Sequence, residues 1–216
     1  MSLKFKNFDP TLGHTKYHMR KLLFVLVVSL VANSSFGQVR LGLKAGVNAA
    51  TVADNEWTKT RFGINAGPIA QINIGKMFFV QSELLYSLKG FKYEYEDSTW
   101  SDHATISLHY INLPVLLGFK AGKNFSIKLG PEIGRLLSAR NETAKIDISN
   151  IYYDFDFGAD LGLSYSFKKL AFDLRYNYGI KKVINLLRTD AWGNPFGEKG
   201  FGKNRTLQLS LYYLIK

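Results

Sequence analysis

A run of two-residue alternation from residue 154 to residue 179 constrains the fold of this chain more than any other feature. Its sequence is DFDFGADLGLSYSFKKLAFDLRYNYG, in which apolar and aromatic side chains take every second position on both sides of Lys168-Lys169. Such alternation across a short turn is typical of a β-hairpin. Each strand has about a dozen residues, whereas a soluble strand usually has about five or six. A membrane-spanning strand needs about 9–11 residues with this alternation, so the hairpin fits that class.

The same period recurs along the rest of the chain and predicts eight antiparallel strands. They are expected at residues 39–49, 62–74, 77–89, 105–119, 125–134, 155–167, 170–179 and 206–215. Short turns at 75–76, 120–124 and 168–169 alternate with long loops, the longest of them at 90–104, 139–153 and 181–203. We therefore predict an all-β fold, an eight-stranded antiparallel up-and-down transmembrane β-barrel.

Two local features of these elements are also expected. Pro68 cannot donate a hydrogen bond within a paired strand, so it predicts a bulge there. The beginning of the longest loop, KKVINLLR, fits either a helical turn or an extension of a strand.

Alternation alone does not say which face of the strands lies inside the barrel. A soluble lipocalin-like barrel turns its apolar face inward, whereas a membrane barrel turns that face outward. The polar faces here are rich in Gly, Asn, Ser and Gln, whereas a soluble exterior needs about 25–35% charged residues. Small side chains suit the narrow interior of eight strands, and aromatic residues gather near the strand ends as membrane girdles do. We therefore expect the apolar face to contact lipid.

Charged residues on the polar faces nearly balance in number. The expected luminal network comprises Arg40, Lys44, Glu83, Lys89, Lys128, Glu132, Asp156, Asp160, Asp173 and Arg175. Buried charges must pair, and a balanced set permits this. We interpret these residues as structural, since they fill and rigidify the lumen.

The first 37 residues are expected to be an N-terminal extension and a cleavable signal peptide, with the barrel spanning 38–216. Arg20 and Lys21 precede an apolar run at 22–32, which is followed by small residues up to Gly37. This order is typical of a secretory signal, and Met19 is an alternative start. The run has 11 residues, against about 20 for a spanning helix, so a membrane anchor is the weaker alternative. Cleavage before Gln38 would leave the mature N-terminus in the periplasm.

Composition excludes several classes of function. The net charge of +11 invites a nucleic-acid partner, but the basic residues are scattered and form no recognisable motif, so we expect none. The chain has no cysteine and therefore no disulfide framework. A diffusion porin needs about 16–18 strands, twice the number expected here.

The long loops carry the candidate ligand contacts. Exposed aromatic side chains favour binding, although in membrane barrels they also anchor to lipid. The candidates are Trp57, Tyr95, Trp100 and Trp192. His103 and His109 lie near serines and acids, the residue types of lipid-modifying hydrolases, but spacing alone does not place a base within reach of a nucleophile. We expect no enzyme activity, no cofactor and no metal.

Four segments resemble the PorT-like outer-membrane β-barrel proteins. They are YYDFDFGADLGLSYSF, LAFDLRYNYGI, QSELLYSLKG at 81–90 and HYINLPVLLGFK at 109–120, within a resemblance that covers about residue 38 to the C-terminus. The resemblance implies an eight-stranded barrel in a Gram-negative outer membrane, and the named member of the family is associated with secretion and gliding motility. The chain departs from the usual aromatic C-terminal residue, because it ends in YYLIK.

Two classes of function remain open at this point. The first is a plugged barrel with a structural or accessory role in the envelope, associated with secretion as the resemblance implies. The alternative is a barrel whose external loops bind a ligand or a surface molecule, and a lipid-modifying hydrolase at the rim is a minor alternative. The expected partners are outer-membrane lipid, the barrel-assembly machinery and envelope or secretion-system proteins.

Overall fold

The computed structural model describes residues 39–53, 58–97, 100–189 and 195–215, with the backbone alone for 95–97, 100–102, 186–189 and 195–199. The expected signal peptide therefore lies outside the described residues. The strands are β1 (Val39–Ala53), β2 (Thr58–Ile74), β3 (Phe78–Glu83), β4 (Leu85–Asp97), β5 (Trp100–Lys120), β6 (Phe125–Asn141), β7 (Ile146–Asp147), β8 (Phe155–Phe167), β9 (Leu170–Gly179), β10 (Ile184–Thr189), β11 (Pro195–Phe201) and β12 (Lys203–Leu214). No helix in these ranges is long and apolar enough to cross a membrane.

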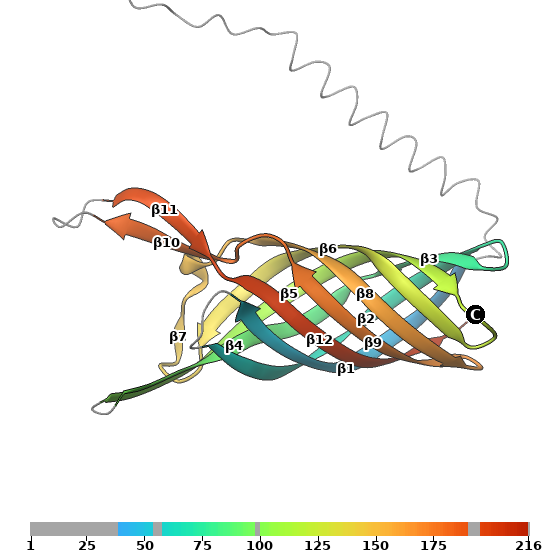
Figure 1. Cartoon of the computed structure of the whole chain (residues 1–216), viewed down its shortest axis with the longest axis horizontal. Coiled ribbons are helices and arrows are strands. Elements are labelled where there is room, and N and C mark those ends of the chain that lie inside the picture. The colour runs from blue at the N-terminus through green and yellow to red at the C-terminus, as the bar shows by residue number, and fades with distance from the viewer. Residues whose placement is uncertain (1–38, 54–57, 98–99, 190–194, 216) are drawn as a thin grey trace, which may run out of the picture. The chain divides into compact units, whose positions relative to one another are not determined.

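Eight of these strand positions close into an antiparallel ring, counting the described residues only. β3 and β4 together occupy one position, because both pair with β2 on one side and with β5 on the other. The order around the ring is β1, β2, β3/β4, β5, β6, β8, β9 and β12. The ring closes because β12 also pairs with β1, with Ala45 opposite Leu211. Figure 1 shows the strands tilted around a common axis. The predicted eight-stranded up-and-down barrel is confirmed, and closure leaves no unpaired sheet edge in lipid.

The exterior of the ring is apolar and the interior is polar, as the alternation predicts. On β12, Leu207, Leu209 and Leu211 are exposed, whereas Gln208 and Ser210 between them are buried. On β9 the apolar face runs from Leu170 to Tyr178, about 26 Å along the strand at ~3.3 Å per residue. A strand tilt of about 40° gives a belt roughly 20 Å high, close to the ~25 Å band of membrane barrels.

Pro68 lies within the continuous strand β2 and does not create the bulge that the sequence predicts there. It lies opposite Leu43 in an unshifted register with β1. On its other side its carbonyl accepts a hydrogen bond from the amide of Leu84, the residue that separates β3 from β4. The missing donor therefore removes a ladder bond and divides the neighbouring strand, while the register shift of β2 lies between Thr60 and Asn65.

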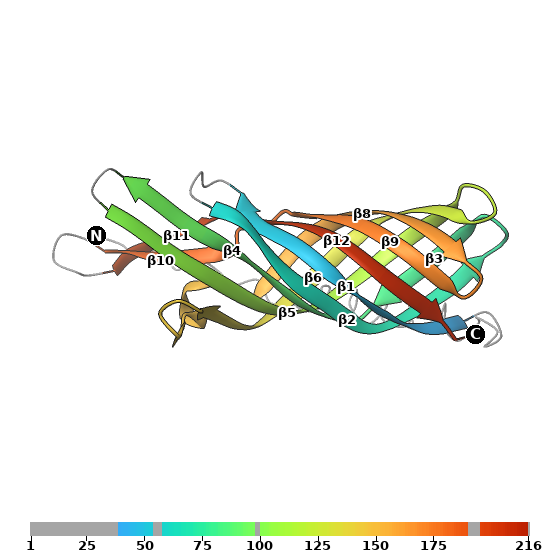
Figure 2. The same cartoon turned by 90° about the horizontal axis from the view of Figure 1, so that it is seen from below.

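The barrel has two unlike ends. The short-turn end holds Val39, Ile215 and the turns after β2, β5 and β8. At the opposite end, which we call the long-connection end, the expected loops 90–104 and 181–203 are largely strands. The β4–β5 hairpin pairs as far as Asp97 with Trp100, and β10–β11 forms a separate two-stranded sheet, so the loop predictions were wrong there. Figures 1 and 2 both show these hairpins projecting beyond the ring at the same end.

Candidate functional site

Arg175 on β9 is the centre of a buried charge cluster in the lumen. Its two terminal nitrogens donate to the two carboxylate oxygens of Glu83 on β3, at 3.0 and 2.5 Å. They also lie 3.4 Å from Asp160 and 3.3 Å from Asp173. All four side chains are fully buried. Because a bidentate pair fixes both position and plane, Arg175 ties β9 to a strand on the opposite side of the ring.

Two lysines, Lys44 and Lys128, complete the charge cluster around Arg175. Lys44 Nζ lies 2.5 Å from Asp173 and 3.3 Å from Glu83. Lys128 Nζ lies 2.5 Å from the other oxygen of Asp173 and 5.0 Å from the ring centre of Tyr212. Asp173 therefore contacts three cations, which compensates the loss of hydration that an isolated buried carboxylate would suffer.

A second group of charges lies nearer the long-connection end. Lys89 donates to Glu132 at 3.0 Å and lies 4.0 Å from Asp156. The same oxygen of Glu132 accepts bonds from Asn112 at 2.8 Å and from Asn177 at 3.1 Å. Amide side chains thus connect the two groups, since Asn177 also donates to Asp160 at 2.6 Å.

The structure brings together every residue of the predicted luminal network except Arg40. The assembled set has four cations and five carboxylates, all buried. Arg40 has the inward parity of this set, but it lies at the short-turn end, where it lines a separate cavity. Its inclusion in the network was therefore wrong, because alternation fixes the face of a side chain and not its depth along the axis.

Apolar side chains cover the charge cluster on both sides. Toward the short-turn end the layer comprises Ile69, Ala171, Tyr212 and Leu214. Toward the long-connection end a larger cluster comprises Val52, Phe91, Ile106, Leu108, Tyr110, Ala139, Tyr152, Val183 and Ile184. Because the charges are paired and the layers around them are apolar, the described lumen is a packed plug.

The larger apolar cluster also forms the floor of a cavity of about 310 Å³ at the long-connection end. Its wall joins β1, β2, β4, β5, the end of β6, the connection after β6, β10 and β11. The residues that line it are Val52, Thr58, Phe91, Tyr93, Ala104, Ile106, Asn141, Ile148, Ile151, Tyr152, Ile184 and Phe201. We call this cavity the apolar pocket.

Two of the polar side chains that line the apolar pocket, those of Thr58 and Asn141, have partners within the protein. Thr58 donates its hydroxyl to the carbonyl of Val52 at 2.7 Å. The side-chain oxygen of Asn141 accepts bonds from the amides of Thr143 and Ala144. Burial raises the pKa of Tyr152, which therefore stays neutral. The pocket thus presents apolar surface to a ligand, and a site of this volume is at the lower end of the range for small-molecule sites.

The side chains of the predicted aromatic ligand contacts lie outside the described part of the chain, so their role stays a prediction. Trp57 and Trp192 lie outside the described residues, and only the backbone of Tyr95 and Trp100 is described, in the β4–β5 hairpin. Sequence reasoning missed the residues that do line the pocket, such as Phe91 and Ile106, because they fall in or beside a segment interpreted as a loop. The alternation of FKYEYED was the available signal.

The histidines near the rim do not form a serine hydrolase arrangement in the described residues. The hydroxyl of Tyr86 and Nδ1 of His109 share a hydrogen bond of 2.6 Å, and the hydroxyl of Ser107 is buried without a partner. His103 is exposed on β5. Within the described ranges, no three His, Asp or Glu side chains converge as a metal site would require.

A closed antiparallel ring with an apolar exterior and a packed polar lumen defines a class, the small integral outer-membrane β-barrels. Residues 31–185 match the family described as "Outer membrane protein beta-barrel domain", and the chain belongs to this family. No curated protein sequence is significantly similar to the chain.

The solved structures that are similar to this chain are distant from it in sequence. Neisserial surface protein A is 16% identical with a TM-score of 0.51, and the match covers 80% of this chain and 96% of that one. Ail, the attachment invasion locus protein of Yersinia pestis, is 15% identical with a TM-score of 0.48, over 82% and 99%. A major outer membrane protein from Thermus thermophilus is 13% identical with a TM-score of 0.49, over 82% and 99%. The first likeness supports the fold alone.

Proposed function

We propose that this barrel binds an apolar small molecule, or the apolar part of a surface molecule, in the apolar pocket. The observation that carries the proposal is a cavity of about 310 Å³ whose wall is almost wholly apolar, and in which Thr58 and Asn141 already have hydrogen-bond partners. Covering an exposed apolar surface with an apolar ligand is favourable by about 25 cal/mol per Å² of surface removed from water. The ligand is held and released without chemical change, so we propose no enzyme activity.

The proposal includes an orientation in the membrane. Outer-membrane barrels have short periplasmic turns and longer external connections. We therefore infer that the long-connection end faces outward and that Val39, at the short-turn end, lies in the periplasm. In this orientation the apolar pocket opens to the cell exterior.

Isoleucine methyl groups provide a direct test, because they lie both in the pocket and on the lipid face. Ile106, Ile148 and Ile184 line the pocket, whereas Ile127 and Ile133 are exposed on β6 toward lipid. Titrating 1-hexanol into the refolded, methyl-labelled barrel should shift the pocket signals with saturation and the lipid-facing signals only linearly. Uniform linear shifts at all five would mean partition into the membrane phase and would refute the proposal.

A matched pair of variants strengthens the same test. Ala104 lines the pocket, and Ala104→Phe should fill it and abolish saturation. Ala66 offers a control, because it is exposed on the lipid-facing side of β2. Ala66→Phe enlarges that outer surface and should leave the saturation intact. Equal behaviour of the two variants would show that the pocket is not the site.

The packed lumen favours a second candidate, a structural or accessory barrel. The resemblance to the PorT-like proteins supports a place beside a secretion system, with envelope proteins as partners. A deletion strain should then secrete and glide poorly, and a pull-down from detergent extracts should recover an envelope protein in stoichiometric amount. Normal secretion by that strain would leave the binding function as the sole candidate.

A further inference from the structure

The short-turn end of the barrel is uniformly cationic. Its described residues, 39–41, 73–79, 119–126, 166–171 and 213–215, contain no Asp or Glu. They contain six cationic side chains, namely Arg40, Lys76, Lys120, Lys123, Lys168 and Lys169. The adjoining lumen has more carboxylates than cations, so the positive charge at this end comes from the rim itself.

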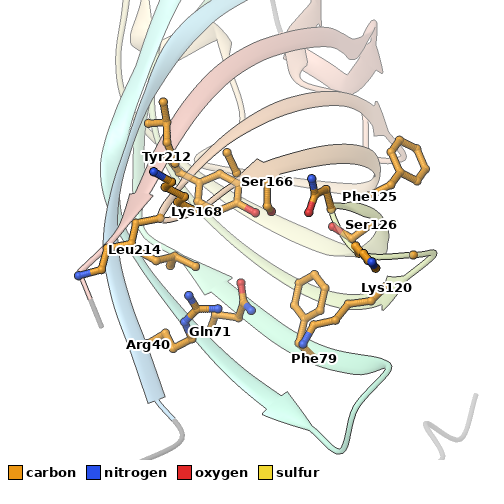
Figure 3. Close-up of a pocket in the computed structure, with 16 residues that line it drawn as sticks. Arg40, Gln71, Phe79, Lys120, Phe125, Ser126, Ser166, Lys168, Tyr212 and Leu214 are labelled. Atoms are coloured by element: carbon orange, nitrogen blue, oxygen red, sulfur yellow. The ribbon is translucent and has the colours of Figure 1, made fainter.

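Five of the six cations line one cavity of about 330 Å³ at the barrel mouth, which we call the basic pocket. Figure 3 shows Arg40 beside Gln71 on one side of the mouth, and Lys120 beside Phe79 on another. Serine hydroxyls of Ser126 and Ser166 also line it. The pocket therefore combines several positive charges with neutral hydrogen-bond donors, which is the chemistry of an anion site.

No acidic side chain neutralises these cations in the described part of the chain. Lys120 donates to the amide oxygen of Asn73 at 3.0 Å, and Lys169 donates to the backbone carbonyl of Ile215 at 3.2 Å. The side chains of Arg40 and Lys123 have neither a hydrogen bond nor an ion pair with a described residue. Neutral partners orient an ammonium group without cancelling its charge, so the pocket keeps its positive potential.

The basic pocket also borders the lipid-facing surface. Phe125 and Leu170 line it, and both side chains are exposed on the apolar exterior of the ring. On the inner side Tyr212 and Leu214 separate it from the charge cluster. A ligand can therefore reach the cations from the membrane edge while its apolar part stays along the barrel wall.

We propose that the basic pocket binds the phosphate group of an anionic phospholipid from the adjoining leaflet. The guanidinium of Arg40 supplies paired donors that match phosphate oxygens, and the lysines add charge. Basic pockets at the membrane surface hold anionic headgroups in this way. The inference requires membrane embedding and is independent of the apolar pocket, so either site can fail without the other.

Native mass spectrometry of the refolded barrel, titrated with phosphatidylglycerol or phosphatidylcholine, tests this directly. Each cation near an anionic headgroup contributes about fivefold in affinity. The triple variant Arg40→Gln, Lys123→Gln, Lys168→Gln should therefore lose at least about tenfold of the preference for phosphatidylglycerol. The control triple Lys92→Gln, Arg140→Gln, Lys145→Gln removes the same charge at the other end and should keep the preference.

Two further measurements use the native chain, so the proposal does not depend on the folding of a variant. Raising the salt concentration from 0.1 to 1 M shortens the Debye length from about 10 to about 3 Å and should abolish the preference. Inorganic phosphate at a concentration equimolar with the lipid should not displace the bound phosphatidylglycerol, because phosphate lacks the apolar chains. Equal lipid preference in both triple variants, or displacement by equimolar phosphate, would overturn the proposal.

Discussion

Replacing Arg175 with methionine should destabilise the barrel more than any other single change in its lumen. Methionine keeps much of the volume and removes the charge, so the effect reports electrostatics rather than a cavity. Arg175 contacts three carboxylates, those of Glu83, Asp160 and Asp173. Its loss changes the luminal set from four cations and five carboxylates to three and five.

The three carboxylates differ in how many cationic partners they keep when Arg175 is replaced. Glu83 keeps Lys44 at 3.3 Å, and Asp173 keeps Lys44 and Lys128 at 2.5 Å each. Asp160 has no other ion pair in the described residues and keeps only the hydrogen bond from an asparagine. Breaking a buried ion pair costs about 3–5 kcal/mol, and we expect a loss in this range. Asp160→Asn in the same background should restore more than about 1 kcal/mol.

Urea unfolding of the barrel refolded in lipid vesicles, followed by the heat-dependent shift of its gel band, gives the free energies of unfolding. Arg175→Lys keeps the charge and serves as the folded reference if the methionine variant refolds poorly. The exposed pair of Lys59 and Glu94 is the control, since Lys59→Met should cost at most about 1 kcal/mol. An Arg175→Met barrel within about 1 kcal/mol of native, unaffected by Asp160→Asn, would refute the electrostatic plug.

Three other predictions concern the fold. Gly130→Ala should cost about 1–3 kcal/mol, because its Cβ would strike a backbone carbonyl of β5, whereas Gly162→Ala meets only ordinary contacts and should be tolerated in the same urea assay. Leu209→Arg on the lipid face should cost about 2–4 kcal/mol. The amide and hydroxyl of Ser149 hold the pKa of Asp147 below its usual range, so this contact is present at neutral pH and is lost only as the pH falls through the lowered pKa. The Ser149 amide NMR signal should titrate there, and Asp147→Asn should abolish the titration.

The sequence predicts the barrel itself because burial in a membrane barrel has a period of two. Leu209 and Gln208 are adjacent residues of opposite parity, and their exposures of 54% and 0% follow that parity. Register and closure follow from the length and spacing of the strands, which the alternation also defines.

Depth along the barrel axis and structure beyond the membrane are harder to predict. Arg40 shares the parity of Lys44 and yet lies at the mouth of the barrel, outside the apolar layer. The β4–β5 hairpin continues past the lipid belt, where polar residues such as Glu94 make a strand resemble a loop. The apolar pocket depends on contacts between segments far apart in the chain, for example Phe91 and Ile184, and no local pattern contains that information.

The orientation of the alternating faces is tested most directly by spin labels attached to single cysteines along β12. The native chain has no cysteine, so Leu207→Cys, Leu209→Cys, Leu211→Cys and Tyr213→Cys each carry one label. In lipid vesicles, dissolved oxygen should relax these labels more strongly than a water-soluble nickel chelate, with the largest ratio at the middle positions. Stronger relaxation by the nickel chelate at all four positions would place the leucines in water and contradict the account.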